Sequence, residues 1–249
     1  MVHELERLRG EVARLRAELA AREREARERS QELVRYAEQL ERAHADARER
    51  ACQLRRSYEA TVRALADAVE ARDAYTAKHA ERVSRYGLEL ARACGIKPEE
   101  QPEMEFGFLL HDIGKVAISD AILHKPGSLT APERHVMQRH PVIGDEIVGR
   151  IDFLREARQV VRSHHERWDG RGYPDGLARD EIPLAARVFA VADTFDALTS
   201  DRPYRAAAPF AVARRVIAEG AGTQFDPDVA DVFATLPDEA LHEIRVAFS

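Results

Sequence analysis

A heptad register runs without interruption from Leu5 to about Ala68, and it constrains the fold of this 249-residue chain more than any other feature. Nine of its ten a positions are apolar, but only five of its nine d positions are. The first 60 residues also carry 14 Arg and 13 Asp or Glu, with no Pro and a single Gly. A pattern of this length is typical of a coiled coil.

About 60 helical residues at ~1.5 Å each would span roughly 90 Å, which is too long for a helix that stands alone. The sequence therefore favours a parallel homodimer through residues 1–65, although the charged d positions weaken the seam. The alternative is a solvated single helix held by Glu–Arg pairs, as the AREREARER stretch would allow.

Beyond residue 65 the composition changes, and this change predicts a second domain over residues 66–249. Gly, Pro and aromatic residues appear, helical patterns shorten, and no clean alternating run indicates a strand. The patterns predict helices over 66–94, 99–112, 130–149, 154–166, 183–199, 209–220 and 227–235. The expected fold class is all-α, with a long N-terminal coiled-coil helix followed by a compact helical domain.

Charge and cysteine content restrict the partners and the compartment. Beyond residue 60 the chain holds 24 basic and 31 acidic side chains, which disfavours nucleic acid as a ligand. A small anionic ligand remains compatible, because bound cations reverse the local field. Cys52 and Cys94 are expected to be free thiols in a reducing compartment. No apolar run approaches ~18 residues, so we expect a soluble, cytoplasmic protein without membrane insertion.

Imidazole and carboxylate side chains recur through the second domain in a pattern typical of a metal-dependent phosphohydrolase. The set comprises His79, the pair His111 and Asp112, His140, the pair His164 and His165, and Asp193. Such groups suit divalent iron, manganese or zinc. Their number exceeds what one tetrahedral ion can use, so it predicts two metals that share a carboxylate. Metals paired at roughly 3.5–4 Å stabilise both the attacking and the leaving oxygen of a phosphate ester.

HDIGK at residues 111–115 is the most specific segment. On the predicted helix His111 and Asp112 diverge by roughly 100° and can approach two metals. Gly114 allows a helix end or a close backbone approach, and Lys115 places a cation one turn on, suited to a phosphoryl oxygen. The apolar FGFLL before this segment buries it, and buried ionisable groups need partners or a metal.

The other ligand motifs are less specific taken singly. HHERWDGRGYPDG at residues 164–176 puts two histidines at a helix end, before a Gly-rich loop that can close over a substrate. His140 precedes a Pro suited to the first turn of a helix, and alone it would more often be structural. A buried, isolated Asp193 would cost several kcal/mol, and Asp196 one turn on is interpreted as an orienting or capping group. His79 is the weakest ligand on local grounds. Histidines without such context, predicted to be surface residues, are His124, His135 and His242.

HDIGK, the His-His pair, the literal GYP at residues 172–174 and SDRPYR together resemble the HD-GYP family, a branch of the HD phosphohydrolases. The match covers roughly residues 66–235. The resemblance implies an all-helical HD-type metal-hydrolase domain around a di- or trinuclear centre, usually of iron or manganese, with zinc, nickel or magnesium as alternatives. It also implies hydrolysis of cyclic di-GMP to pGpG, and in many members onward to GMP, in bacterial second-messenger signalling.

The resemblance also assigns roles to matching positions. It makes metal ligands of the seven His and Asp side chains, with Asp112 as the bridge between two ions. It makes Lys115 the phosphate-facing cation, and it places substrate contacts on Tyr173 of GYP and on Arg202 and Arg205 of SDRPYR.

One departure bears on the metal count. Members with a third metal use an extra Glu at the position of Tyr75, so we expect two divalent ions per chain, and the release of GMP stays open. One alternative function is hydrolysis of another cyclic dinucleotide. A catalytically weak signalling module is the other, although such a module would normally lack some ligands. The expected partners are cyclic di-GMP, a second copy of the chain, and an upstream sensor or signalling protein acting through the coiled coil.

Overall fold

The computed structural model of the chain describes residues 2–72, 78–201 and 205–248. The expected all-α class is confirmed, because these residues form no strand beyond an isolated bridge between Ala221 and Phe225. The chain divides into two compact units, residues 1–58 and 59–249. The long N-terminal helix is α1 (Val2–Glu70), so its last turns belong to the second unit.

Within the first unit α1 exposes the apolar residues of the heptad register. Leu5, Leu19 and Leu40 are 52, 58 and 72% exposed. Ion pairs one turn apart, such as Arg29 with Glu25 at 2.8 Å, line the same segment. Each such surface pair contributes only about 0.3–0.5 kcal/mol, so these pairs account for little of the stability of so long a helix. No helix among the described residues is both long enough and apolar enough to cross a bilayer.

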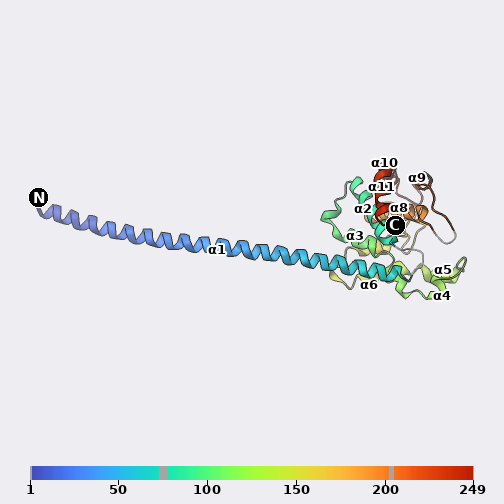
Figure 1. The fold of residues 1–249 in the computed structure, drawn as a ribbon, viewed down its shortest axis with the longest axis horizontal. Coiled ribbons are helices and arrows are strands. Elements are labelled where there is room, and N and C mark those ends of the chain that lie inside the picture. Colours follow the sequence, from blue (N-terminus) through green and yellow to red (C-terminus); the bar gives the residue numbers. More distant parts are fainter. Residues whose placement is uncertain (1, 73–77, 202–204, 249) are drawn as a thin grey trace. The chain divides into compact units, whose positions relative to one another are not determined.

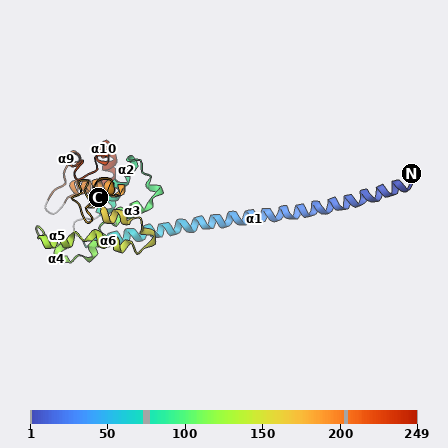
Figure 2. The ribbon, with the colours of Figure 1, turned by 180° about the vertical axis from the view of Figure 1, so that it is seen from behind.

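Short helices build the second unit (Figures 1 and 2), with α2, α8, α9 and α10 on one side of it and α4, α5 and α6 on the other. The helices are α2 (His79–Ala93), α3 (Pro102–Leu109), α4 (Asp120–Leu123), α5 (Ala131–Met137), α6 (His140–Val148), α7 (Arg158–Ser163), α8 (Leu184–Thr199), α9 (Phe210–Glu219), α10 (Pro227–Thr235) and α11 (Asp238–Ala247). Single 3-10 turns are η1 (Pro98–Glu100), η2 (Ile113–Ala117), η3 (Asp152–Leu154) and η4 (Arg179–Glu181).

Two clusters of buried apolar side chains hold this unit together. One joins α2, α8, α9 and α10 and is rich in aromatic rings, with Tyr86 and Phe195 edge to face at 5.1 Å. The other joins the end of α1 to α3, α6 and α7 through residues such as Val62 and Val161. Phe189 of the first cluster lies 4.7 Å from the ring of His111, which follows α3. The predicted ligands therefore lie where the two clusters approach each other.

Several predicted helix boundaries are wrong. The helix expected over 66–94 is interrupted: α1 ends at Glu70, and α2 begins only at His79, after a left-handed Lys78 with φ 61°. The helix expected over 130–149 divides into α5 and α6. The helix expected over 99–112 ends at Leu109, so His111 lies in a turn before η2 rather than on a helix. The helices α4 and α11 were not predicted.

Candidate metal centre

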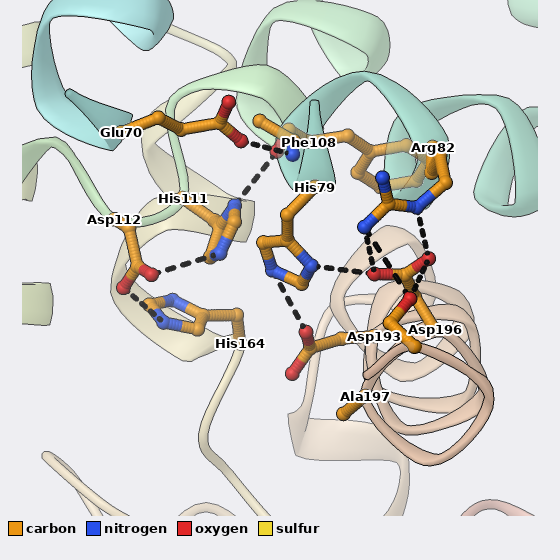
Figure 3. A network of polar contacts seen from close by, with 12 residues as sticks. Glu70, His79, Arg82, Phe108, His111, Asp112, His164, Asp193, Asp196 and Ala197 are labelled. Carbon is orange, nitrogen blue, oxygen red and sulfur yellow. Dashed lines mark hydrogen bonds and ion pairs between the residues drawn. The ribbon is translucent and has the colours of Figure 1, made fainter. Parts of the chain in front are cut away.

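The seven predicted ligands lie together in the second unit and form two groups. Within each group, the candidate ligand atoms all lie within 4.8 Å of one another. The histidine-rich group consists of Asp112, His140, His164 and His165. The carboxylate-flanked group consists of His79, His111 and Asp193. Figure 3 shows members of both groups turned toward one another from α2, the HDIGK turn, the end of α7 and α8. The fold thus gathers side chains that are up to 114 residues apart in the sequence.

Three of the histidines are oriented by the ends of helices. In each, ring atom Nδ1 lies within hydrogen-bond distance of the carbonyl oxygen three residues earlier, in the last turn of α3, α5 or α7. The pairs are His111 with Phe108 at 2.9 Å, His140 with Met137 at 2.8 Å, and His164 with Val161 at 2.8 Å. These carbonyls have no partner within their helix, so they accept the imidazole N–H. The lone pair of Nε2 is then left for a metal, the arrangement usual for ligand histidines.

Asp112 lies between the two groups. Its Oδ1 is 3.2 Å from Nε2 of His140 and 4.0 Å from Nε2 of His164. Its Oδ2 is 3.2 Å from Nε2 of His111 and 2.7 Å from Nζ of Lys115. Burial raises the pKa of this carboxyl, but the charges of Lys115 and His111 outweigh it and hold the pKa well below its usual range. Asp112 is therefore ionised at neutral pH, with one oxygen toward each group.

His79 lies between two carboxylates. Its Nε2 is 3.4 Å from Asp193 and its Nδ1 is 2.7 Å from Asp196, which also accepts a hydrogen bond from Arg82 at 2.7 Å. Burial lowers the pKa of His79, but hydrogen bonds and charges from the two aspartates raise it to about 10. Burial likewise raises the pKa of Asp193, but His79 lowers it to about 2. In the metal-free protein His79 is thus an imidazolium, with Asp196 placed to orient its ring.

His164 and His165 have the opposite electrostatic environment. Burial and the charges of neighbouring histidines hold the pKa of His164 well below its usual range. The same two causes, burial first, lower the pKa of His165 to about 4. Both rings are neutral at pH 7, which is the form that coordinates a metal.

Gly114 of the HDIGK turn packs directly against the start of α6. A Cβ atom at this position would lie 1.9 Å from the carbonyl oxygen of His140 and 2.6 Å from the backbone nitrogen of Gly144. Any side chain at residue 114 would therefore push the turn away from α6. The close approach brings Asp112 within reach of His140.

The GYP loop lies against the histidine-rich group. The ring of Tyr173 stacks on the ring of His165 with centroids 4.7 Å apart. The backbone N–H of Tyr173 donates to the carbonyl oxygen of His165 at 3.2 Å. The buried carboxylate of Glu166 accepts hydrogen bonds from the N–H groups of Asp175 and Gly176 at 2.7 and 3.1 Å. The loop is thus fixed to the two residues that follow His164, with Tyr173 over the ligands.

The other predicted substrate contacts are placed only in part. Arg205 is exposed, and its guanidinium donates to the carbonyl oxygen of Ala197 on α8, one turn beyond Asp193. Arg202 and Tyr75 lie outside the described residues. Cys52 and Cys94 are free thiols. The histidines predicted to be surface residues are exposed, namely His124, His135 and His242.

Two residues near the ligands were missed in the sequence. Arg82 lies one turn after His79 on α2, a spacing that could have marked it as a partner of Asp196. Glu70 accepts hydrogen bonds from the N–H groups of Lys78 and Ala80, on either side of His79. No local pattern signals this contact.

Comparison with known proteins gives a consistent result. The model of the HD domain family matches residues 63–229. A cyclic di-GMP phosphodiesterase of Thermotoga maritima is 41% identical over 172 residues, covering 68% of this chain and 47% of the relative. A cyclic di-GMP phosphodiesterase response regulator of Xanthomonas campestris is 44% identical, over 66% of this chain and 44% of the relative.

Other relatives differ in the ligand that they are named for. A 3'3'-cGAMP-specific phosphodiesterase of Vibrio cholerae is 39% identical over 69% of this chain and 33% of its own length. The chain thus spans less than half the length of these curated relatives. Among solved structures, a cyclic GMP-AMP specific phosphodiesterase of V. cholerae has a TM-score of 0.55 at 17% identity, over 74% of this chain and 52% of that one. At that identity the likeness shows the fold alone.

Proposed function

The chain belongs to the HD domain family, and on that premise we propose that it is a metal-dependent phosphodiesterase that hydrolyses cyclic di-GMP. The observation that carries the proposal is the convergence of seven imidazole and carboxylate side chains, with Asp112 at their centre. The names of the relatives supply the substrate class, since they are phosphodiesterases of cyclic dinucleotides.

The donor set fits two divalent ions. The histidine-rich group offers three imidazole nitrogens and one Asp112 oxygen, and the carboxylate-flanked group offers two imidazoles and Asp193. Asp112 would bridge the groups, because its two oxygens face different sides of the centre. Nitrogen and oxygen donors without sulfur suit iron or manganese, with zinc, nickel or magnesium as alternatives. We infer two ions per chain.

The residues around the ligands suit hydrolysis of a phosphodiester. Bound divalent ions would polarise the phosphoryl oxygens and lower the pKa of a water nucleophile. Lys115, held at Asp112, would bind a phosphoryl oxygen and stabilise the charge that develops on it. Tyr173 would line the substrate side of the histidine-rich group, and Arg205 with Arg202 would offer forked donors to the second phosphate or to a guanine edge. The product would be pGpG, with hydrolysis onward to GMP as a further step.

Hydrolysis of 3'3'-cGAMP is the second candidate function, because relatives named for that ligand match this chain at 39% identity. The two ligands differ in one base and share the phosphodiester ring, so the same centre could cleave either. A catalytically weak binding module is a third reading, which the complete ligand set disfavours.

One experiment separates these functions. The protein is loaded with manganese or iron, its metal content is measured, and cyclic di-GMP and 3'3'-cGAMP are supplied separately and in competition, with products followed by chromatography. We expect about two ions per chain, cleavage of cyclic di-GMP in preference, and a Lys115→Ala variant that keeps its metal while kcat falls. A metal-loaded protein that binds but cleaves neither ligand would establish the binding module instead.

We also propose that residues 1–65 form a parallel coiled-coil homodimer. The apolar a positions are uncovered in the single chain. A parallel, in-register pair would place Glu11 of one copy beside Arg16 of the other, a favourable pair, and Glu18 beside Glu23, an unfavourable one. In this arrangement the helices would relay a signal from an upstream sensor or signalling protein.

The dimer is tested at two a positions in the middle of the register. Leu33→Asp combined with Leu40→Asp would bury facing charges, so light scattering should find a monomer whose metal content is unchanged. The matched control, Val34→Asp with Ala45→Asp, changes positions outside the seam and should remain dimeric. A wild-type protein that is monomeric at micromolar concentration would contradict the proposal.

We place the protein in the cytoplasm. Cys52 is exposed and Cys94 is also a free thiol, which suits a reducing compartment. Cyclic dinucleotides, the proposed substrates, are intracellular messengers in the family that the motifs resemble.

A further inference from the structure

The C-terminal end of α1 is anchored in the second unit. Val62, Ala66 and Val69 are buried there among residues of α3, α6 and α7. Arg63, on the same turns, pairs with Glu81 of α2 at 2.9 Å and with Glu105 of α3 at 2.8 Å. The last turns of α1 are therefore held on several sides before the helix ends at Glu70.

Glu70 caps the first turn of α2 from outside that helix. The N-cap residue of α2 is Lys78, which makes no side-chain capping bond. The N–H groups at a helix start have no partner within the helix and normally need a capping side chain. Glu70 accepts from the N–H of Lys78 at 3.0 Å and, through its other oxygen, from the N–H of Ala80 at 2.5 Å. These two amides flank His79, so the carboxylate fixes the backbone that carries this ligand (Figure 3).

Arg72 holds a second ligand-bearing segment. Its guanidinium donates to the carbonyl oxygens of Val116 at 2.7 Å and Ile118 at 3.2 Å, and to the carboxylate of Asp120 at 2.7 Å. These acceptors lie at and just beyond the end of η2, the turn that directly follows Asp112. Arg72 therefore fixes the far end of the turn whose near end supplies the bridging carboxylate.

The Glu70 contact borders a small space behind the predicted ligands. A cavity of about 20 Å³ is lined by Val69 and Glu70 from α1, by His79 from α2, and by His111 and Asp112 from the HDIGK turn. Each oxygen of Glu70 accepts a backbone N–H, and Glu70 belongs to neither group of candidate ligands, so its place is that of a residue that positions ligands.

We propose that Glu70 and Arg72 are positioning residues, through which the end of α1 sets the spacing between His79 and the His111–Asp112 turn. The inference rests on the proposed metal centre, because its consequence is the separation of the two ligand groups. Glu70 acts on the carboxylate-flanked group through His79, and Arg72 acts on the bridge through η2. A displacement of the end of α1 would change both at once.

The test uses full-length protein with Glu70→Ala, Glu70→Gln and Arg72→Ala. The control is Glu133→Ala, which removes a carboxylate that also accepts a backbone N–H at a helix start, that of Thr130 at 2.7 Å. Three quantities are measured: amide hydrogen exchange at Lys78 and Ala80 without metal, manganese affinity by calorimetry, and kcat and KM on cyclic di-GMP.

Glu70→Ala should speed exchange at both amides and weaken manganese binding at one site by about tenfold to hundredfold, as found when groups that orient ligands are lost. Its kcat should fall while KM stays within about twofold. Glu70→Gln, with one acceptor oxygen, should restore part of the affinity. Arg72→Ala should leave exchange at Ala80 unchanged and weaken both sites, since Asp112 serves both. A uniform loss of stability would not weaken one metal site in Glu70→Ala and both sites in Arg72→Ala.

The outcomes separate the two proposals. Wild-type protein that neither binds manganese nor cleaves the substrate would refute the metal centre, whereas faster exchange in Glu70→Ala with wild-type affinity and kcat would refute the positioning role alone. If Glu70→Ala does not fold by circular dichroism, Glu70→Gln decides: wild-type exchange, affinity and kcat in that variant would overturn the inference. Glu133→Ala should match wild type throughout.

Discussion

In the histidine-rich group, burial and neighbouring imidazoles hold the pKa of His164 and His165 low, whereas in the carboxylate-flanked group Asp193 and Asp196 raise the pKa of His79 to about 10. The side chains are of one type and all are largely buried, so their different protonation comes from what surrounds them. A metal can bind His164 and His165 without displacing a proton, but it must displace one from His79. The two halves of the proposed metal centre should therefore differ in how metal binding depends on pH.

The largest effect is expected where the two groups meet. Asp112→Ala removes the one carboxylate that faces both, so both groups should lose metal and activity should fall by on the order of 10³-fold or more. Elemental analysis and product chromatography measure this. Asp152→Ala, at an exposed aspartate, is the control and should change neither. Retention of one tightly bound ion in Asp112→Ala would show that the groups are independent and would remove the bridge.

The free energy of unfolding of the metal-free protein should depend on pH in opposite ways for the two groups. The histidine-rich group should lower it at acid pH, and His79 should lower it at alkaline pH. The unfolded chain binds protons to His164 and His165 near pH 6.5, and the folded chain does not, so stability should fall as pH drops from about 6.5 toward 4. For His165 alone the loss is on the order of 3 kcal/mol. His79 contributes stability that is complete below pH 6.5 and is lost as pH rises through about 10. The aspartates, whose pKa values are lowered, add a loss only below pH 3.8.

Urea unfolding of chelator-treated protein at several pH values measures these losses of stability. His165→Gln should reduce the loss of stability at acid pH to the share of His164 and leave the loss at alkaline pH, and His124→Ala, at an exposed histidine, should leave both unchanged. Equal stability at pH 7 and pH 5 in the metal-free wild type would contradict the electrostatic difference between the groups.

A smaller effect, confined to one group, is expected from Asp196→Asn. The amide forms a weaker hydrogen bond with the His79 ring than the carboxylate does. The manganese affinity of the carboxylate-flanked group should therefore fall by about tenfold to hundredfold, and that of the histidine-rich group should not change. Two-site calorimetry resolves the groups. Asp226→Asn is matched, because Asp226 is also a buried aspartate paired with an arginine, at 2.7 Å from Arg187. An equal fall in the manganese affinity of both groups would show that Asp196 stabilises the fold in general.

The sequence was informative where a local signal and a ligand coincide. Pro141 marked the first turn of α6 and so placed His140, and the Gly-rich loop after His164 marked the end of α7. The residue types of the seven side chains predicted a metal-binding cluster, and the structure brings these side chains together. These features depend on residues adjacent in the chain, which is why patterns reveal them.

The sequence was uninformative where a distant contact decides the structure. No Gly or Pro occurs in residues 66–79, yet the chain leaves the helix after Glu70, and Lys78 adopts φ 61°. The break is stabilised by Glu70 capping α2 and by Arg72 binding carbonyls at and just beyond the end of η2, and neither contact has a local signature. For the same reason His79 was the weakest predicted ligand, although the fold places it at the centre of a charged network.

The placement of three predicted ligand imidazoles on carbonyls in the last turns of α3, α5 and α7 also predicts which changes in chain length the protein tolerates. One residue inserted within α7 would turn everything after it by about 100° and advance it by ~1.5 Å, and His164 would no longer face Asp112. An insertion in the exposed segment between Lys125 and Thr130 changes no helix that ends on a ligand. Homologous chains should therefore vary in length in that segment and keep the lengths of these three helices constant.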